Sequence, residues 1–337
     1  MSNQKQLRVV FMGTPDFSVP TLEALIKAGH SIVGVYCQPD KQKGRGKQVQ
    51  MPPVKVAALE HNLPVYQPVT LRDEQVQAEL EALKPDVIVV IAYGKILPPW
   101  LIQLPQYGCI NVHASILPNY RGAAPIHYAI LNGDTKTGIT IMHMDDGLDT
   151  GDIIDIVETD ILPSETTGQL FERMAVLGGE TIVPVLTRWV NGDIVATPQD
   201  DTMATHTAKI TKEMGRIDWS KPAHEIVNLI RGLNPAPGCY TYLDGKRLKV
   251  WMAENPDVIS IGEAVLNVSV QGKTVEVSTN QDAGTIVGRT GGLVVLCGDK
   301  NVVLLTEVQP ENKKRISATD FINGHQIKEG IVFGDSN

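Results

Sequence analysis

The chain has 337 residues and a hydrophobic fraction of 42%, which fits a globular protein of two domains, each large enough for its own core. Its formal net charge is −8, and this excess of acid lies in residues 1–204, which hold 15 Lys and Arg against 23 Asp and Glu, whereas residues 205–337 hold 15 of each. An acidic chain is not typical of a general nucleic-acid binder, but the neutral second half leaves an RNA-binding domain open.

Cysteine usage and the lengths of the apolar runs exclude further classes. The four cysteines form no Cys-x-x-Cys pair, which argues against a zinc site and against a disulfide framework. The first apolar run is too short for a signal peptide, and no segment approaches membrane-spanning length. We therefore expect a cytoplasmic protein without a membrane partner.

The first segments of the chain predict a parallel sheet. Residues 7–12 and 31–37 are short apolar runs, and the helical pattern of residues 21–28 lies between them. This order is typical of an α/β fold with a Rossmann-like parallel sheet and helices on both faces. The turn at Gly13 lacks the Gly-x-Gly-x-x-Gly fingerprint, which argues against a dinucleotide cofactor. Residues 85–94 include the most apolar run of this half and predict a central strand.

A basic segment follows the second apolar run. In it, Lys41, Lys43, Arg45 and Lys47 alternate with Gly and Gln. We expect a mobile, positively charged loop, because glycine disfavours order and like charges repel one another. A solvated surface loop without a ligand would carry the same charges. The segment follows the carboxyl end of a strand, however, where open α/β sheets bind their ligands, and this position favours a functional role.

The stretch that follows the central strand carries a chemical pattern. Asn111 and His113 are two residues apart, so in an extended segment both side chains project from the same face. Residues 139–144 predict another strand, which runs into a Gly-rich turn with Asp149. If this turn folds back beside the first segment, the carboxylate can orient the imidazole. The three side chains would then supply an oxyanion donor, a base and a group that orients the base.

Two simpler interpretations of this stretch rank lower. The Asn could cap a strand end and the His could be buried in the core, but this leaves the combination of motifs around them unexplained. The acids near Asp149 could suggest a calcium loop. A loop that starts at Asp149 would place Gly151 and Ile153 at ligand positions, so the match fails and we expect no metal.

The second half of the chain predicts a different architecture. Residues 164–183 predict a helix that Pro184 ends or kinks. Residues 191–211 have little apolar periodicity and predict a linker. Beyond it, short apolar runs alternate with Gly-containing turns, which is typical of a small antiparallel barrel. The expected division is a catalytic domain at 1–190, the linker, and a C-terminal domain at 212–337.

Three motifs occur in order in the first half. They are Asn-x-His at 111–113, Ser-Ile-Leu-Pro-Asn-Tyr-Arg-Gly-Ala-Ala-Pro at 115–125, and Gly-Leu-Asp-Thr-Gly at 147–151. Together they resemble the formyltransferase family that uses 10-formyltetrahydrofolate, and the resemblance covers nearly the whole chain. It implies a catalytic set of Asn111, His113 and Asp149. It also implies folate contacts at Ser115, Ile116, Leu117 and Pro118 and, around the pterin, at Ala92, Tyr93 and Gly94.

The resemblance also implies an activity. The formyl group of 10-formyltetrahydrofolate, the formyl donor, would pass to the α-amino group of methionyl initiator tRNA, for translation initiation. Folate and initiator tRNA would be the partners, with no metal and no obligate protein partner. The basic loop with Lys41, Lys43, Arg45 and Lys47 would enter the acceptor stem, and an OB-like C-terminal barrel would be a platform for tRNA.

Two rival functions stay open at this point. The same chemistry could act on another amine, such as glycinamide ribonucleotide or an amino sugar, and the catalytic motif alone does not exclude this. The basic loop disfavours it. A noncatalytic RNA-binding protein of the same fold is the other rival, but it would not need Asn111, His113 and Asp149 together.

Overall fold

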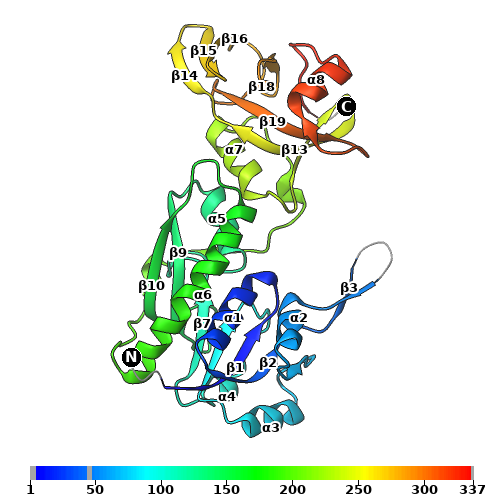
Figure 1. The fold of residues 1–337 in the computed structure, drawn as a ribbon. Coiled ribbons are helices and arrows are strands. Elements are labelled where there is room, and N and C mark those ends of the chain that lie inside the picture. Colours follow the sequence, from blue (N-terminus) through cyan, green and yellow to red (C-terminus); the bar gives the residue numbers. More distant parts are fainter. Residues whose placement is uncertain (1–4, 44–47, 335–337) are drawn as a thin grey trace. The chain divides into compact units, whose positions relative to one another are not determined.

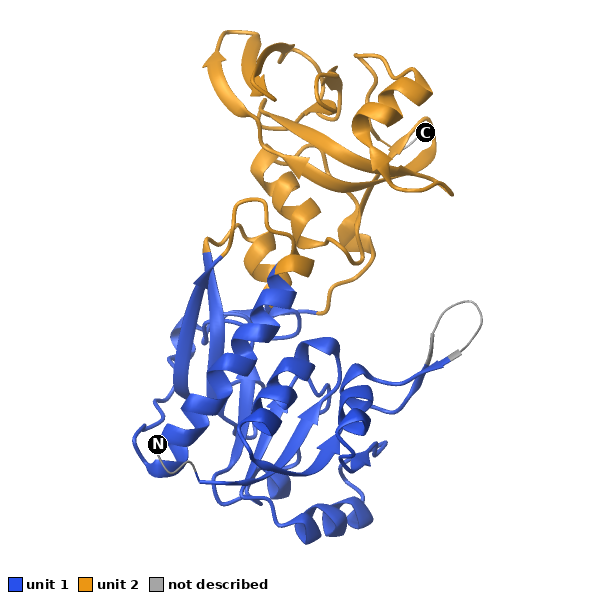
Figure 2. Ribbon diagram, viewed as in Figure 1, with its two compact units in different colours: residues 1–125, 136–160, 170–208 blue, residues 126–135, 161–169, 209–337 orange. Residues whose placement is uncertain are grey.

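The computed structural model describes residues 5–43 and 48–334, which fall into two compact units (Figure 2). Unit 1 contains the described residues of 1–125, 136–160 and 170–208, and unit 2 contains those of 126–135, 161–169 and 209–337. Most of the expected linker therefore packs with unit 1. The expected domain ranges 1–190, 191–211 and 212–337 stay predictions about which parts fold and act independently.

Unit 1 is built on a seven-stranded sheet (Figure 1). Its strands, from one edge to the other, are β10 (Asp152–Asp160), β9 (Lys136–His143), β7 (Cys109–His113), β6 (Val87–Ile91), β1 (Arg8–Gly13), β2 (Ser31–Tyr36) and β5 (Val65–Tyr66). The last five strands of this order run parallel, and β9 and β10 add two antiparallel strands. Every residue of β6 and β7 is buried, as expected for strands covered on both faces.

Helices cover both faces of this sheet. They are α1 (Val19–Lys27), α2 (Pro53–Glu60), α3 (Glu74–Leu83), α4 (Pro99–Ile102) and α6 (Thr167–Asn191). Leu80 of α3 and Leu101 of α4 share a core cluster with Val10 and Ile88 of the sheet. On the other face, α6 passes directly over β7, where a Cβ on Gly178 would contact the Val112 side chain at 3.3 Å. The expected α/β fold with helices on both faces is confirmed.

The sequence predicted that Pro184 breaks or kinks α6, and the helix continues past this proline to Asn191, so it is not broken there. Val185 and Leu186, directly after the proline, are 3% and 1% exposed. Their burial favours a further helical stretch, although proline cannot donate the usual backbone hydrogen bond. The helix ends at Asn191, and the next residue, Gly192, has a φ of +78°, in the left-handed region typical of a glycine after a helix.

The described residues of unit 2 combine α-helices with antiparallel strands. The helices are α5 (Pro125–Leu131), α7 (Ala223–Gly232) and α8 (Ala318–His325). One sheet contains β12 (Cys239–Leu243), β13 (Lys246–Glu254), β19 (Val302–Pro310), β18 (Leu293–Leu296) and β17 (Ile286–Gly288), with β20 (Ile316–Ser317) paired to β19. A second contains β14 (Asp257–Ile261), β15 (Val265–Val270) and β16 (Lys273–Ser278). This confirms the expected C-terminal antiparallel, OB-like β domain.

The expected basic loop is more ordered at its base than the sequence indicated. Strands β3 (Lys41–Lys43) and β4 (Gln48–Gln50) pair as an antiparallel ribbon. A polar network holds its root: the Lys55 ammonium donates to Asp40 at 2.8 Å and to Gln67 at 2.7 Å. The Gln67 amide in turn donates to the carbonyl oxygen of Gln38 at 2.9 Å. These contacts join the start of the ribbon to α2 and to the end of β5, a tertiary effect with no local sequence signal.

The close approach of α6 to α1 predicts a difference between two adjacent glycines. A Cβ on Gly179 would lie 2.7 Å from the Pro20 carbonyl oxygen, so Gly179→Ala should force the two helices apart. We expect it to lower the free energy of unfolding by about 1–3 kcal/mol. Gly178→Ala is the matched control, because its Cβ would meet side chains only, and we expect a change below about 1 kcal/mol. Denaturant unfolding followed by circular dichroism measures both, and equal losses would contradict the close packing.

Candidate active site

Strand β7 carries two of the predicted catalytic side chains to the carboxyl end of the sheet. Asn111 pairs with Val90 of β6 and Met142 of β9, and His113 pairs with Thr140 of β9. Their spacing of two residues places both on one face of the strand, as the sequence predicted. Asn111 is 9% and His113 7% exposed, so both groups lie in a largely dry environment.

The turn between β9 and β10 brings Asp149 to the same place. Its Oδ1 lies 3.4 Å from Asn111 Nδ2 and 3.7 Å from His113 Nδ1. The second distance is too long for a hydrogen bond. Its Oδ2 accepts a hydrogen bond from the Gly122 N–H at 2.8 Å. One carboxylate therefore faces the amide and the imidazole, and the structure brings the three side chains together.

The imidazole of His113 lies between two acceptors. Its Nε2 is 3.1 Å from the backbone carbonyl oxygen of Tyr120, so Nε2 is the donor in this contact. Its Nδ1 faces Asp149. The two ring nitrogens therefore face different oxygen atoms, one of the backbone and one of a side chain.

Several residues around this centre adopt left-handed backbone conformations. The φ angles are +55° at Asp149, +63° at Tyr120, +60° at Ala124 and +46° at Ala92. Each such residue costs on the order of 1–3 kcal/mol and persists only where its surroundings fix it. Their concentration here indicates a site whose geometry is imposed by contacts between segments.

The turn after β7, expected to contact folate, is fixed by internal hydrogen bonds. Ser115 is fully buried and its hydroxyl donates to the Asn119 carbonyl oxygen at 2.6 Å. Thr140 Oγ1 donates to the Ser115 carbonyl oxygen at 2.6 Å and accepts from the Leu117 N–H at 3.1 Å. Leu117 is buried, whereas Ile116 and Pro118 are half-buried. A ligand can therefore contact this turn mainly at the backbone of the turn and at the Ile116 and Pro118 side chains.

The second predicted folate segment follows β6. Ala92 and Gly94 are exposed, but the Tyr93 ring lies in the core, and burial raises the pKa of its phenol. Its carbonyl oxygen accepts hydrogen bonds from Thr14 Oγ1 at 3.0 Å and Gln38 Nε2 at 3.1 Å. Tyr93 can therefore contribute backbone to a binding site at this turn, but its ring packs inside the unit.

The predicted tRNA-contacting residues are placed only in part. Lys41 is exposed at the start of β3, and Lys43 ends that strand. Arg45 and Lys47 lie outside the described residues. Lys41 also lines a cavity of about 420 Å³ at the carboxyl ends of β1 and β2, together with Thr14, Asp16 and Met51. This cavity adjoins the Tyr93 turn through Thr14.

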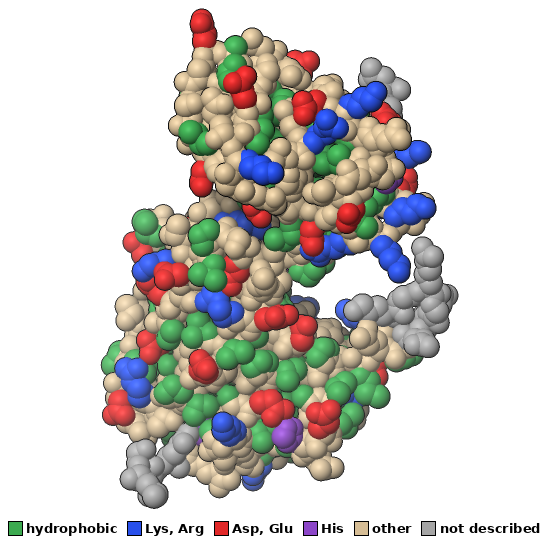
Figure 3. All heavy atoms as spheres, turned by 45° about the horizontal axis from the view of Figure 1, so that its top comes forward, with side chains coloured by type: hydrophobic (Ala, Val, Ile, Leu, Met, Phe, Trp, Pro, Cys, Tyr) green, Lys and Arg blue, Asp and Glu red, His purple; other side chains and the backbone are tan. Residues whose placement is uncertain are grey.

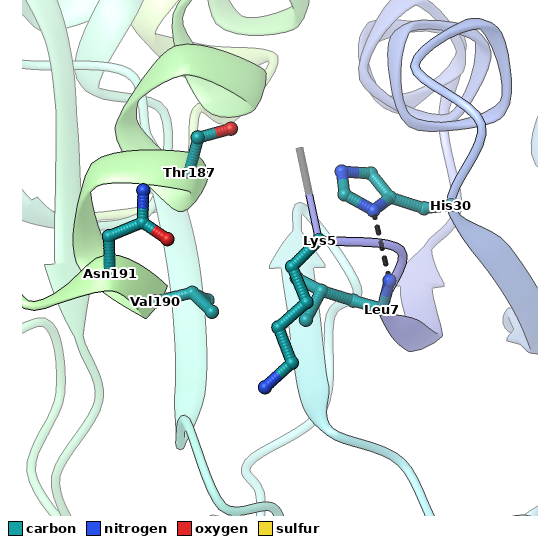
Figure 4. Close-up of a pocket in the computed structure, with 6 residues that line it drawn as sticks. All are labelled: Lys5, Leu7, His30, Thr187, Val190 and Asn191. Carbon is teal, nitrogen blue, oxygen red and sulfur yellow. Dashed lines mark hydrogen bonds between the residues drawn. The ribbon is translucent and has the colours of Figure 1, made fainter. Parts of the chain in front are cut away.

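A much smaller cavity lies at the other end of the sheet (Figure 4). It is enclosed by Leu7, His30 and the last turns of α6, and its volume of about 10 Å³ matches a single water molecule. His30 Nδ1 accepts a hydrogen bond from the Leu7 N–H at 3.3 Å. The size of this cavity excludes a substrate.

The sequence did not indicate the role of residues 199–207, which we call the strap. Within it, β11 (His206–Thr207) pairs in parallel with β8 (Arg121–Gly122), which lies in the sequence motif at 115–125. The Arg121 guanidinium, 4% exposed, bonds to Gln199 and forms an ion pair with Asp201 at 2.7 Å. Arg121 was part of a recognised motif, but a polar segment without apolar periodicity offers no signal that it packs against that motif.

Two negative findings concern the described residues alone. Residues 5–43 and 48–334 place no group of three His, Cys, Asp or Glu side chains where they could hold a metal ion. Within the same ranges, each helix is too short or too polar to cross a membrane.

Comparisons with known proteins identify the family. Residues 7–186 match the family model described as formyl transferase, and residues 209–326 match the formyl transferase, C-terminal domain. A methionyl-tRNA formyltransferase from Alkaliphilus oremlandii is 44% identical over 329 residues, covering 98% of this chain and 100% of the relative. The methionyl-tRNA formyltransferase of Bacillus subtilis is 44% identical over 331 residues, covering 98% of each chain.

Solved structures share the fold at lower identity. An N-formyltransferase from Helicobacter canadensis, in complex with folinic acid and dTDP-3-aminofucose, gives a TM-score of 0.61 at 18% identity, over 90% of this chain and 100% of that one. HypX from Aquifex aeolicus, in complex with tetrahydrofolic acid, gives 0.60 at 15% identity, over 99% of this chain and 51% of that one. The matched family models and the full-length relatives confirm the resemblance seen in the sequence: the chain belongs to the formyl transferase family.

Proposed function

We propose that this chain transfers the formyl group of 10-formyltetrahydrofolate to the α-amino group of methionyl initiator tRNA. The observation that carries the proposal is the convergence of Asn111 and His113 on one oxygen of Asp149, at 3.4 and 3.7 Å. The choice of substrates is based on methionyl-tRNA formyltransferases that are 44% identical over nearly the whole chain. The rival amine substrates lack comparable support, because the likeness to the N-formyltransferase in complex with dTDP-3-aminofucose, at 18% identity, shows the fold alone.

The three side chains divide the chemistry between them. The α-amine attacks the formyl carbon, a bond to that carbon forms, and the bond to N10 of the folate then breaks. The Asn111 amide donates to the developing oxyanion, and protonated His113 supports it after exchanging its contact with the Tyr120 carbonyl for the substrate. Asp149 keeps the imidazole oriented while the amine proton passes to N10. The reaction needs no covalent enzyme intermediate.

The folate is assigned to the two turns beside these groups. Ser115, Ile116, Leu117 and Pro118 present a backbone that Thr140 fixes from β9. The turn of Ala92, Tyr93 and Gly94 follows the neighbouring strand β6, which pairs with β7. Adjacent parallel strands end at the same edge of a sheet, so both turns border the catalytic set.

One face of unit 2 combines aromatic and basic side chains. Lys249 Nζ lies 5.3 Å and Arg315 Cζ 5.2 Å from the centre of the Trp251 ring, and Arg247 Cζ lies 5.7 Å from that of Tyr240. Along β12 and β13 these residues alternate with buried ones, so they point away from the core. We call them the aromatic-basic face. Lys and Arg side chains are spread over the surface of unit 2 seen in Figure 3.

We assign the aromatic-basic face to tRNA. Unpaired bases stack on aromatic rings, and basic side chains neutralise phosphates and release counterions. Lys41, Lys43, Arg45 and Lys47 are assigned to the acceptor end, because their segment follows β2 and Lys41 borders the 420 Å³ cavity. We therefore assign tRNA binding to the C-terminal domain, residues 212–337.

The catalytic assignment predicts large losses from small changes. His113→Asn and Asn111→Ala should each lower kcat at least about a hundredfold, because each removes a group that acts on the developing charge. Formyl transfer to methionyl-tRNA under saturating substrates measures this. His127→Asn, at a half-buried histidine of α5, is the control and should retain most of the activity. Near-normal turnover in either site variant would refute the assignment.

The aromatic-basic face predicts two distinguishable effects on tRNA binding. Trp251→Ala should cost about 1–3 kcal/mol of binding through lost stacking. Lys249→Ala should weaken binding of every tRNA and lower the slope of log affinity against log salt by about 1. Binding measured over a series of salt concentrations separates the two.

Lys273→Ala is the matched control for this face. Lys273 is exposed on β16, in the other sheet, so the substitution removes the same charge from the same unit. It should leave both the affinity and the salt slope close to those of the wild type. If Lys273→Ala and Lys249→Ala weakened binding equally, the effect would come from net charge, and the aromatic-basic face would not be a tRNA contact.

A further inference from the structure

Gln199, in the strap, contacts the catalytic centre from outside it. Its Nε2 donates to the backbone carbonyl oxygens of Asp149, at 2.9 Å, and of Gly151, at 2.7 Å. Its Oε1 accepts from Arg121, with Nε at 3.1 Å and Nη2 at 2.9 Å. A primary amide has two donor hydrogens and two acceptor lone pairs, so this side chain uses all four.

The two segments that Gln199 joins both reach the catalytic side chains. The residue before Arg121 is Tyr120, whose carbonyl oxygen lies 3.1 Å from the imidazole Nε2. The residue after it is Gly122, whose N–H donates to Asp149 Oδ2 at 2.8 Å. On the other side, Gln199 binds the carbonyl of Asp149 itself. Gln199 therefore connects the turn that carries the Asp149 carboxylate to residues 120–122, which contact this carboxylate and the imidazole.

Hydrogen bonds from the Tyr120 and Arg121 backbone hold the strap in place, and this fixes the position of Gln199. The Arg121 N–H donates to the Thr205 carbonyl oxygen at 2.9 Å, and Thr205 Oγ1 accepts from the Tyr120 N–H at 2.8 Å. A Cβ on Gly122 would lie 2.7 Å from the Thr207 carbonyl oxygen, so the two segments pass in direct contact.

We propose that Gln199 is a positioning residue for formyl transfer, which keeps the Asp149 carboxylate beside the amide and imidazole of β7. The inference rests on the proposed function. Asp149 has a φ of +55°, a conformation that few non-glycine residues adopt. The turn is therefore held in this conformation by its contacts, and the two carbonyls that Gln199 binds lie on either side of Thr150.

A purely structural role would be to satisfy the buried guanidinium of Arg121. Gln199→Glu separates the two roles, because a carboxylate still accepts from Arg121 but cannot donate to the Asp149 and Gly151 carbonyls. Gln199→Ala removes both sets of contacts. Asp200→Ala is the matched control: this exposed neighbour bonds to Thr202 within the strap.

The first test is steady-state formyl transfer by the full chain. Gln199→Ala and Gln199→Glu should each lower kcat by about 10- to 100-fold, because even a small displacement of the Asp149 carboxylate from its productive position slows the reaction by this order. KM for both substrates should change by less than about threefold, because the loss concerns the transition state. Asp200→Ala should stay within about twofold of the wild type in both constants, as expected for an exposed side chain remote from the reacting groups.

A double-mutant cycle makes the test specific to Asp149. In an Asp149→Asn background, the further loss from Gln199→Ala should shrink to less than about threefold, because the carboxylate that it positions is gone. The same loss in both backgrounds would show a general structural role and overturn the inference. So would a kcat for Gln199→Glu within about threefold of the wild type.

Backbone hydrogen exchange provides a readout that does not depend on activity. Exchange in residues 145–151 should be faster in Gln199→Glu than in the wild type and in Asp200→Ala. Wild-type exchange in Gln199→Glu would overturn the inference. If the wild-type chain itself transferred no formyl group, the proposed function would fail, and the exchange measurement would still decide the role of Gln199.

Discussion

The candidate site depends on one carboxylate oxygen. Asp149 Oδ1 faces both Asn111 Nδ2 and His113 Nδ1, at 3.4 and 3.7 Å. The amide and the imidazole come from one strand, so the pleat of β7 fixes their separation. The carboxylate comes from a turn, and neither a helix nor a strand fixes it. Its position is instead set by polar contacts with Gly122 and with the strap, and the left-handed backbone at Asp149 shows that these contacts oppose the local preference.

Much of this arrangement could be predicted from the sequence because its signals are local. The spacing of Asn111 and His113 determines their common face, and apolar runs of strand length predict the parallel sheet. The sequence left open whether Pro184 ends or kinks α6, since the answer depends on the burial of Val185 and Leu186 in a core formed by distant segments.

The strap shows the same limit for the site. Gln199 and Arg121 are 78 residues apart, and Gln199 and Asp149 are 50 apart. Contacts at such separations leave no periodic pattern. The residues of segment 191–211 are exposed or half-buried, so its composition is that of a linker. Within it, Gln199 nevertheless bonds to carbonyl oxygens and to the Arg121 guanidinium of the motif.

The parallel pairing of β8 with β11 has a consequence for synthesis of the protein. A chain that emerges from the ribosome from its N-terminus acquires the strands of the sheet, the amide, the imidazole and the carboxylate before the strap exists. Until residues 199–207 have emerged, Arg121 lacks Gln199 and Asp201, and the Asp149 turn lacks the amide that holds it. A nascent chain of about 150 residues therefore has every catalytic group but not the complete scaffold. The site is therefore complete only once the strap has been synthesised, well after the last catalytic residue.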